Sequence, residues 1–398
     1  MSTAPARTTV GVIGAGPAGL LLARLLHRAG VDCVVLESHD RAYCEQRQRA
    51  GMLEQATVDA LHAAGAGERL AREALRHDGI ELRFDRRAHR LDFPGLTGGR
   101  YVWIYAQTEI VKDLIALQLK DGPPLLFDAE ALAVDGLDGE RARIRYRHNG
   151  AERTLTCDWI AGCDGHHGVS HAAVPGAVTY EREYPYSWLG ILADAPPSSE
   201  VLVYAHSPRG FALHSMRSPT VGRLYLQVPN GTDPGDWSDT RIWDELDARF
   251  AIDADWRLTR GPITAKAVLP MRSSVTEPMR HGRLLLAGDA AHIVPPTGAK
   301  GLNLAVADVV VLADALTAAH RTGDTALLDA YSATCLDRVW RAEHFSYFMT
   351  STLHTDPDQT AFTTRLQLAQ LSRIAASRHA AAELAENYAG LPIDRPTP

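Results

Sequence analysis

The chain has 398 residues, of which 45% are hydrophobic and 22% are charged, so disordered and fibrous classes are excluded. Its 41 lysines and arginines against 48 aspartates and glutamates give a formal net charge of −7, which argues against nucleic acid as the main partner. The length predicts two or three packed domains.

The sequence gives no sign of a membrane or secretory segment. Its apolar stretches break before the roughly 20 residues that cross a bilayer, and residues 1–10 lack the apolar core of a secretory signal. Five cysteines without metal-ligand spacing predict reduced thiols, no metal site and a cytoplasmic location.

The N-terminal segment predicts a strand, a helix and a second strand. Residues 8–13 are apolar and β-branched, residues 20–29 have helical apolar spacing, and residues 31–36 are again apolar. Parallel strands joined by a helix imply a sheet that is covered on both faces. Two later strands, 159–162 and 283–287, are expected to end at the same edge of this sheet.

The turn between the first strand and helix carries Gly14, Gly16 and Gly19 in the spacing of a dinucleotide-binding motif. In such a motif the first glycine permits the tight turn, the second lets the backbone approach a pyrophosphate, and the third lets the helix pack against the strand. Glu37 follows the second strand, where a carboxylate accepts from ribose hydroxyls. The motif predicts dinucleotide binding but does not distinguish FAD from NAD(P).

Later segments resemble the flavoprotein aromatic hydroxylases. Residues 284–292 resemble the second FAD fingerprint of that family, and Cys163-Asp164-Gly165 resembles the third. The similarity continues through 49–55, 107–109, 188–190, 204–213, 288–303 and 386–392, nearly to the C-terminus. The resemblance implies FAD as cofactor, with Asp289 on a ribityl hydroxyl and Asp164 near FAD and NAD(P)H. Asp289 alone also suits a helix N-cap.

The predicted fold is α/β: a Rossmann-like FAD-binding domain of the flavoprotein hydroxylase type, with an inserted antiparallel sheet for substrate and a C-terminal helical region. Short β-rich segments between 184 and 272 indicate the inserted sheet, and an Ala- and Leu-rich pattern indicates the helices. The predicted bounds are 1–182 and 272–316 for the FAD-binding domain, 183–271 for the substrate domain and 317–398 for the helices.

The resemblance implies an enzyme that adds a hydroxyl group at position 3 of 4-hydroxybenzoate, giving 3,4-dihydroxybenzoate. Such a reaction uses NADPH or NADH and O2 through a flavin hydroperoxide that must be kept from water. Two alternatives stay open: the same mechanism on another phenolic or amino-substituted benzoate, and an FAD-containing protein that binds an aromatic acid without hydroxylating it. A homodimer is expected from the family.

The resemblance and the motifs together predict a set of cofactor-binding residues. Residues 296–298 are expected to pass the flavin, and the helix that follows would stabilise negative charge there. Lys300 on its own also suits a solvated surface charge. The predicted cofactor residues are Gly14, Gly16, Gly19, Glu37, Arg47, Arg49, Gln107, Asp164, Asp289, Gly298, Lys300, Leu302 and Asn303.

An aromatic acid needs a cation at one end and a hydrogen-bond acceptor at the other. Arg217 can grip a carboxylate with two parallel bonds, and Ser215, two residues away, points to the same strand face. Tyr225 would complete the carboxylate site. These three residues match family positions, and the resemblance adds Tyr204 and Thr297 to the substrate contacts. The alternative for Arg217 is a surface ion pair.

The resemblance also implies the groups that activate the phenol. Tyr204 would take its proton, Tyr388 would receive it, and His77 would carry it toward solvent. The alternative is two core tyrosines and a surface histidine. Pro296 is predicted beside the reacting centre, and Arg223 matches an arginine that helps the flavin to move. These five residues are the predicted catalytic group.

Two segments depart from the family pattern. His166 and His167 follow Asp164-Gly165, whereas the family commonly has an aromatic residue directly after this pair. His171 stands where the family often has a more basic residue. The stretch 38–45 also differs, and its family counterpart reads the 2′-phosphate of NADPH. Asp40 and Glu45 would repel that phosphate, whereas His39 and Arg41 would attract it, and the balance slightly favours NADH.

Overall fold

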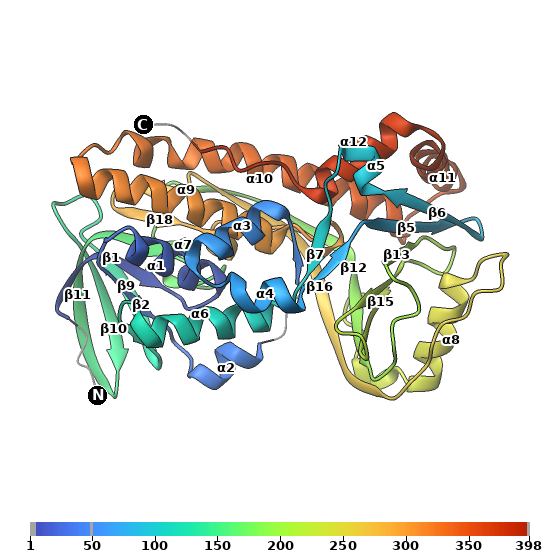
Figure 1. Ribbon diagram of the computed structural model, residues 1–398, viewed down its shortest axis with the longest axis horizontal. Helices are drawn as coiled ribbons and strands as arrows, with labels where there is room; N and C mark the ends of the chain where they lie inside the picture. The colour runs from blue at the N-terminus through green and yellow to red at the C-terminus, as the bar shows by residue number, and fades with distance from the viewer. Residues whose placement is uncertain (1–4, 48–50, 396–398) are drawn as a thin grey trace.

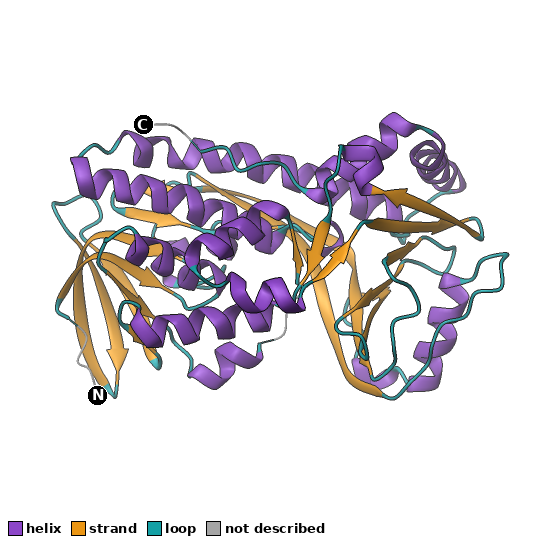
Figure 2. Cartoon of the chain, viewed as in Figure 1, coloured by secondary structure: helices purple, strands orange, loops and turns teal. Residues whose placement is uncertain are grey.

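The computed structural model describes residues 5–47 and 51–395, which form two eight-stranded sheets and one three-stranded sheet. The two large sheets lie at opposite ends of an elongated molecule (Figure 1). The long helices α9 (Gly301–Thr322) and α10 (Ala326–Leu353) run along one side of it. Figure 2 shows helices packed over the sheet at the N-terminal end, as predicted for parallel strands that are joined by helices.

The first sheet contains the predicted parallel strands. Its order is β17 (Arg280–His281), β18 (Leu284–Leu286), β11 (Ala151–Gly162), β1 (Arg7–Ile13), β2 (Cys33–Leu36) and β8 (Leu125–Leu126). In addition, β10 (Ala142–His148) pairs with β11, and β9 (Ala129–Asp135) pairs with β10. Both β1 and β18 pair with β11 in parallel, and Ile13, Gly162 and Leu286 stand side by side. The prediction that three strands end at one sheet edge is therefore confirmed.

Helix α1 (Pro17–Arg28) packs between the first sheet and α9, and its buried residues are mostly leucines and alanines, together with Gly19 and Arg24. By length and composition alone α9 is apolar enough to cross a membrane. However, 72% of its apolar 18-residue stretch is buried inside the protein. We interpret α9 as a core helix. The shorter helices of this half are α2 (Arg41–Gln46), α3 (Gln55–Ala64), α4 (Gly67–Glu73), α6 (Gln107–Asp121) and α7 (Val169–Ala172).

The second sheet separates two apolar clusters. Its order is β19 (His292–Ile293), β16 (Ile263–Glu277), β12 (Val178–Ala193), β15 (Gly222–Pro229), β14 (Ala212–Met216), β13 (Leu202–Ala205), β5 (Gly79–Phe84) and β6 (Arg87–Asp92). One face packs on α8 (Asp239–Phe250). The other faces α5 (Phe93–Thr97), α10, α11 (Ala361–Ala376) and α12 (Arg378–Ala389).

The remaining elements are a small sheet and short 3₁₀ turns. The three-stranded sheet has the order β3 (Met52–Leu53), β7 (Val102–Ile104) and β4 (Leu75–His77). Three 3₁₀ turns are η1 (Pro234–Asp236), η2 (Gly288–Ala290) and η3 (Pro296–Gly298).

The second sheet extends beyond the bounds predicted for the substrate domain, 183–271. Strands β5 and β6 belong to it although they lie within the segment 1–182, and β5 pairs in parallel with β13. β12 begins at Val178 and β16 ends at Glu277, so both cross the predicted bounds. Pairing between strands more than a hundred residues apart leaves no local sequence signal, which explains the difference.

Glu343 of α10 predicts a specific pH dependence of stability. It is buried, its Oε2 accepts from Ser273 Oγ at 2.9 Å, and its Oε1 has no hydrogen-bond partner among the described residues. Burial raises the pKa of Glu343 from 4.5 to about 7. The folded state therefore keeps a proton that the unfolded chain releases, and stability falls as pH rises from about 4.5 to about 7.

We expect Glu343→Gln to remove this slope and to stabilise the protein at pH 8 by roughly 2–4 kcal/mol. Urea unfolding at pH 5 and pH 8 measures both effects. An equal slope in the two proteins would contradict the assignment.

Candidate active site

The glycine turn has the geometry that its motif predicts. Gly14 has φ +102°, and a Cβ there would lie 2.4 Å from the Cys163 carbonyl oxygen. A Cβ on Gly19 would lie 2.0 Å from the Gly14 carbonyl oxygen, so the helix packs closely on the turn. A Cβ on Gly16 would meet no atom of the described residues within 4 Å, which leaves open the space that a pyrophosphate would use.

Three acids surround this turn. Glu37 follows β2, is buried, and accepts from the Ala15 backbone N–H at 2.7 Å. Asp164 accepts from the Ser170 N–H at 3.0 Å, but its Oδ1 is buried without a hydrogen-bond partner among the described residues. Burial raises the pKa of Asp164. Asp289 lies exposed in η2 at the end of β18. An unsatisfied acceptor beside an open glycine turn fits a ligand rich in hydroxyl groups.

Two glycine substitutions separate cofactor binding from folding. We expect Gly16→Val to fold normally but to lose FAD affinity by at least about tenfold, because its side chain would occupy the open space. Gly19→Ala should instead destabilise the protein by about 1–3 kcal/mol, because its Cβ would overlap the Gly14 carbonyl. Flavin absorbance after purification and thermal unfolding measure the two effects. A Gly16→Val protein that retains normal FAD content would contradict this placement.

The remaining predicted cofactor residues have varied surroundings. Arg47 is exposed, Gln107 is the half-buried first residue of α6, and Arg49 lies outside the described residues. Leu302 is half-buried in the first turn of α9, and Gly298 is buried in η3. The N-terminal end of α9 therefore follows the loop predicted to pass the flavin.

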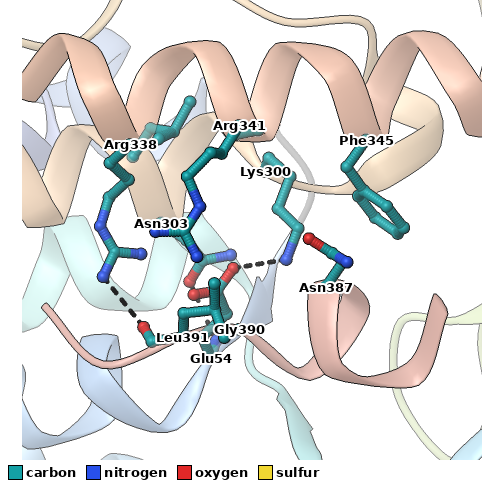
Figure 3. A pocket seen from close by; sticks show the side chains of 11 residues that line it. Glu54, Lys300, Asn303, Arg338, Arg341, Phe345, Asn387, Gly390 and Leu391 are labelled. Atoms are coloured by element: carbon teal, nitrogen blue, oxygen red, sulfur yellow. Dashed lines mark hydrogen bonds and ion pairs between the residues drawn. The ribbon is translucent and has the colours of Figure 1, made fainter. Parts of the chain in front are cut away.

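Lys300 is buried, and its alternative as a solvated surface charge is wrong. Its Nζ donates to Glu54 Oε1 at 2.6 Å and to the Tyr388 carbonyl oxygen at 3.1 Å. Figure 3 shows this pair in a pocket that Arg338, Arg341, Phe345 and Asn387 also line. The ion pair joins the segment between β3 and α3 to the start of α9, and the hydrogen bond to the Tyr388 carbonyl joins α12 to it.

Asn303 connects the same elements through both ends of its amide. Its Oδ1 accepts from the Glu54 N–H at 2.9 Å and the Thr57 hydroxyl at 2.7 Å. Its Nδ2 donates to the Met52 and Ala299 carbonyl oxygens, each at 3.1 Å. Asn303 therefore fixes α9 against the segment that follows residues 48–50.

The second sheet brings the predicted substrate residues to one face. Tyr204, Leu213 and Tyr225 stand side by side on β13, β14 and β15, and Ser215 stands opposite Arg223. Residues two apart on a strand share a face, so all five side chains belong to the face toward α10 and α12. Ser215 Oγ donates to the Arg223 carbonyl oxygen at 3.1 Å.

Arg217 follows β14 directly and is half-buried. Its Nη2 donates to the hydroxyl of Thr108 in α6 at 3.1 Å. Burial and the nearby charge of Arg223 lower the pKa of Arg217. The Arg223 guanidinium lies 5.4 Å from the centre of the Tyr225 ring. Two neighbouring cations with hydroxyl groups around them suit a carboxylate.

The two relay tyrosines touch. The hydroxyl oxygens of Tyr204 and Tyr388 lie 2.6 Å apart, and the two side chains are 1% and 0% exposed. The Tyr204 hydroxyl also lies 3.4 Å from the carbonyl oxygen of Thr297 in η3, beside half-buried Pro296. Burial raises the pKa of both tyrosines above the ordinary value of 10. Both are therefore neutral hydroxyl groups near pH 7.

His77, the third relay residue, ends β4 and is buried, so its alternative as a surface histidine is wrong. Its Nδ1 has no hydrogen-bond partner among the described residues, and burial lowers its pKa to about 4. No hydrogen bond between described residues joins it to Tyr388. The backbone N–H of Phe93 donates to the carbonyl oxygen of Asp78, the residue after His77, and the Phe93 ring packs on the Tyr388 ring with 5.1 Å between the ring centres.

Several residues around the site were not predicted. Glu54, Thr108 and Thr350 contact Lys300, Arg217 and Thr297 respectively, and each comes from a distant part of the chain. Glu54 lies within the similar stretch 49–55, and this similarity is the sequence signal that pointed to it. Thr108 lies in the similar stretch 107–109, whereas Thr350 is an ordinary helix residue whose contact depends on the tertiary fold.

The fold and the site together define a nucleotide-binding fold of the flavoprotein type, whose second sheet presents buried tyrosines and an arginine on one face. Residues 7–346 match the family described as FAD binding domain. The chain is 44% identical over 390 residues to p-hydroxybenzoate hydroxylase of Acinetobacter baylyi, covering 98% of this chain and 96% of that protein. The chain belongs to this family of FAD-dependent aromatic monooxygenases and uses FAD as cofactor.

Two more distant matches are also named as monooxygenases. An uncharacterized aromatic compound monooxygenase of Bacillus subtilis is 29% identical over 325 residues, covering 80% of this chain and 64% of that protein. The crystal structure of p-nitrophenol 4-monooxygenase from Pseudomonas putida has a TM-score of 0.81 at 20% identity, covering 97% of this chain and 99% of that one. The structural match bears out the fold class.

Proposed function

We propose that this chain hydroxylates 4-hydroxybenzoate at position 3, giving 3,4-dihydroxybenzoate with consumption of O2 and of NADH or NADPH. One observation carries the proposal: a single sheet face presents Tyr204, already paired with Tyr388, together with Ser215, Arg223 and Tyr225. The relative named p-hydroxybenzoate hydroxylase supports the same substrate.

The chain's own residues bind and orient the substrate in this proposal. Arg217 binds the carboxylate through two parallel N–H donors, with Ser215 and Tyr225 beside it. Tyr204 accepts the proton of the phenol at the opposite end. Bound FAD supplies the oxygen transfer to the ring carbon next to the phenol oxygen. Thr297 and Pro296 close the space on the side of α9.

Proton removal needs a path away from the buried phenol. The contact between Tyr204 and Tyr388 supports a first transfer, because hydroxyl groups both donate and accept. His77 is proposed as the next carrier. Burial keeps its ring neutral near pH 7, so the ring carries a proton by accepting it at one nitrogen while it releases the proton on the other. Ordered water would join His77 to the tyrosines.

The experiment is a turnover assay on the purified protein. We expect a yellow protein that consumes NADH or NADPH and forms one 3,4-dihydroxybenzoate for each 4-hydroxybenzoate. Consumption that yields hydrogen peroxide alone would leave FAD binding intact and contradict hydroxylation. Amino- and dihydroxybenzoates should give lower kcat/KM, and a higher value for one of them would make that compound the substrate.

We infer a slight preference for NADH over NADPH. The two groups that would attract a 2′-phosphate are both engaged: His39 Nδ1 lies 3.0 Å from Glu37 Oε1, and Arg41 donates to Glu45 at 2.6 Å. Asp40 adds a further negative charge. The ratio of kcat/KM for the two nucleotides tests this inference. A preference for NADPH of about a hundredfold, worth about 2.7 kcal/mol, would contradict it.

We also propose a homodimer in the cytoplasm. Phe362 and Leu366 of α11 are 71% and 56% exposed, and Tyr347 of α10 is 43% exposed, so these C-terminal helices present apolar side chains to the outside. Light scattering of the purified protein measures the mass. Two chains per particle would support the proposal, and a single chain would refute it.

A further inference from the structure

His354 follows α10 and lies between that helix and the second sheet, outside the residues proposed for substrate or cofactor. Its side chain is buried, at 2% exposure. Its Nδ1 lies 2.9 Å from the Thr350 carbonyl oxygen. Its Nε2 lies 2.6 Å from the indole nitrogen of Trp188 in β12. Both ring nitrogens are therefore in use.

The two contacts fix which nitrogen of His354 carries the proton. A carbonyl oxygen only accepts, so Nδ1 donates to Thr350. The indole N–H only donates, so Nε2 must be the bare acceptor for Trp188. Burial lowers the pKa of His354 to about 3, which keeps this neutral form near pH 7. The ring is a fixed link between α10 and β12.

His354 also belongs to an aromatic layer behind the proposed substrate pocket. Its ring is parallel to that of Tyr186 at 4.8 Å and lies 4.2 Å from that of Phe211. On the far side of this layer, Trp188 lies 4.7 Å from the ring of Tyr225. Phe211 lies 6.2 Å from the ring of Tyr204. One imidazole thus stands behind both proposed substrate tyrosines.

Thr350, which accepts from His354, also contacts residues 296–298, the loop that is proposed to pass the flavin. The hydroxyl of Thr350 lies 2.9 Å from the hydroxyl of Thr297, whose carbonyl oxygen is the one near Tyr204. All of these groups are buried. A shift of His354 would therefore reach the pocket from two directions, through Trp188 and through α10.

We propose that His354 is a positioning residue for the hydroxylation, acting by holding the Trp188 indole so that Tyr204 and Tyr225 keep one arrangement. This inference rests on the proposed function, because those tyrosines are its substrate contacts. When the indole is released, the substrate ring binds in more than one pose, and oxygen transfer to the correct carbon becomes less frequent.

Three substitutions separate the two hydrogen bonds of the ring. His354→Gln places an amide oxygen near the position of Nε2 and keeps an acceptor for Trp188. His354→Asn reaches only the position of Nδ1, and His354→Phe keeps the ring without either bond. His206→Phe is the matched control. His206 is buried at the same junction, with its Nδ1 3.1 Å from the Leu353 carbonyl oxygen, and does not bond to Trp188.

We expect His354→Asn and His354→Phe to raise the KM for 4-hydroxybenzoate about tenfold, because Tyr204 and Tyr225 would no longer hold the substrate in one arrangement. The product formed per nucleotide consumed should fall at least about twofold. His354→Gln should restore both values to near those of the wild type. His206→Phe should lower the unfolding temperature and leave both values unchanged.

An NMR signal gives a readout that does not depend on turnover. The indole N–H resonance of Trp188 is assigned by its absence in Trp188→Phe. It should move in His354→Asn and His354→Phe and stay in place in His354→Gln. Unchanged KM and product yield in His354→Phe, with an active wild type, would overturn the inference. A wild type that forms no 3,4-dihydroxybenzoate would instead overturn the proposed function.

Discussion

Tyr204→Phe should reduce the formation of 3,4-dihydroxybenzoate by about a hundredfold or more while substrate-dependent consumption of NADH or NADPH continues. The substitution removes one oxygen atom and keeps the ring that packs on Phe211. Without that hydroxyl the phenol has no direct acceptor for its proton and stays neutral. A neutral phenol is a much poorer target for an electrophilic oxygen than a phenolate, so the consumed nucleotide should yield hydrogen peroxide.

Tyr331→Phe is the control for this experiment. Tyr331 is also fully buried, and its hydroxyl donates to the Leu286 carbonyl oxygen at 2.7 Å, in the half of the molecule that holds the first sheet. Its loss should reduce stability by about 1 kcal/mol and leave the product yield unchanged. Normal product yield in Tyr204→Phe would show that the tyrosine pair does not activate the substrate.

Arg217→Lys should weaken the binding of 4-hydroxybenzoate by roughly 10- to 100-fold. A guanidinium presents two parallel donors to a carboxylate, whereas an ammonium acts as a single point of charge. The loss should appear in the dissociation constant, measured by titrating the change in flavin absorbance with substrate. Flavin content should stay normal, because Arg217 follows a strand of the second sheet and is not among the predicted cofactor residues.

Arg249→Lys is the matched control for the arginine. Arg249 lies in α8 on the opposite face of the same sheet, is buried, and pairs with Glu245 at 3.2 Å. Its replacement should lower stability without changing the dissociation constant. Equal losses of affinity in the two variants would mean that Arg217 supports the sheet and does not hold the substrate.

Local sequence patterns predicted the parts of the molecule that local physics determines. The strand at residues 8–13, the glycine turn and the helix after it each depend on neighbouring residues, and the structure contains all three. The segment 184–272 alternates short apolar runs with turns, which is typical of an antiparallel sheet. Tyr204 and Tyr388 came from a resemblance, since no local pattern links residues 184 positions apart.

The parts that sequence missed depend on contacts between distant segments. Strand β5 joins the second sheet through pairing with β13, and Lys300 meets Glu54 across 246 positions. A lysine that follows a glycine-rich segment in the sequence is equally typical of a surface charge in solvent. Trp188 and His354 are 166 positions apart, and each alone reads as an ordinary core residue. Their hydrogen bond exists only once β12 and α10 are packed.

The most direct measurement is a crystal structure of the protein with FAD and 4-hydroxybenzoate bound. We expect the carboxylate within hydrogen-bonding distance of Arg217 and Ser215, and the phenol oxygen within the same distance of the Tyr204 hydroxyl, with Tyr388 behind it. A substrate bound in the reverse direction, or away from this face of the sheet, would contradict the account.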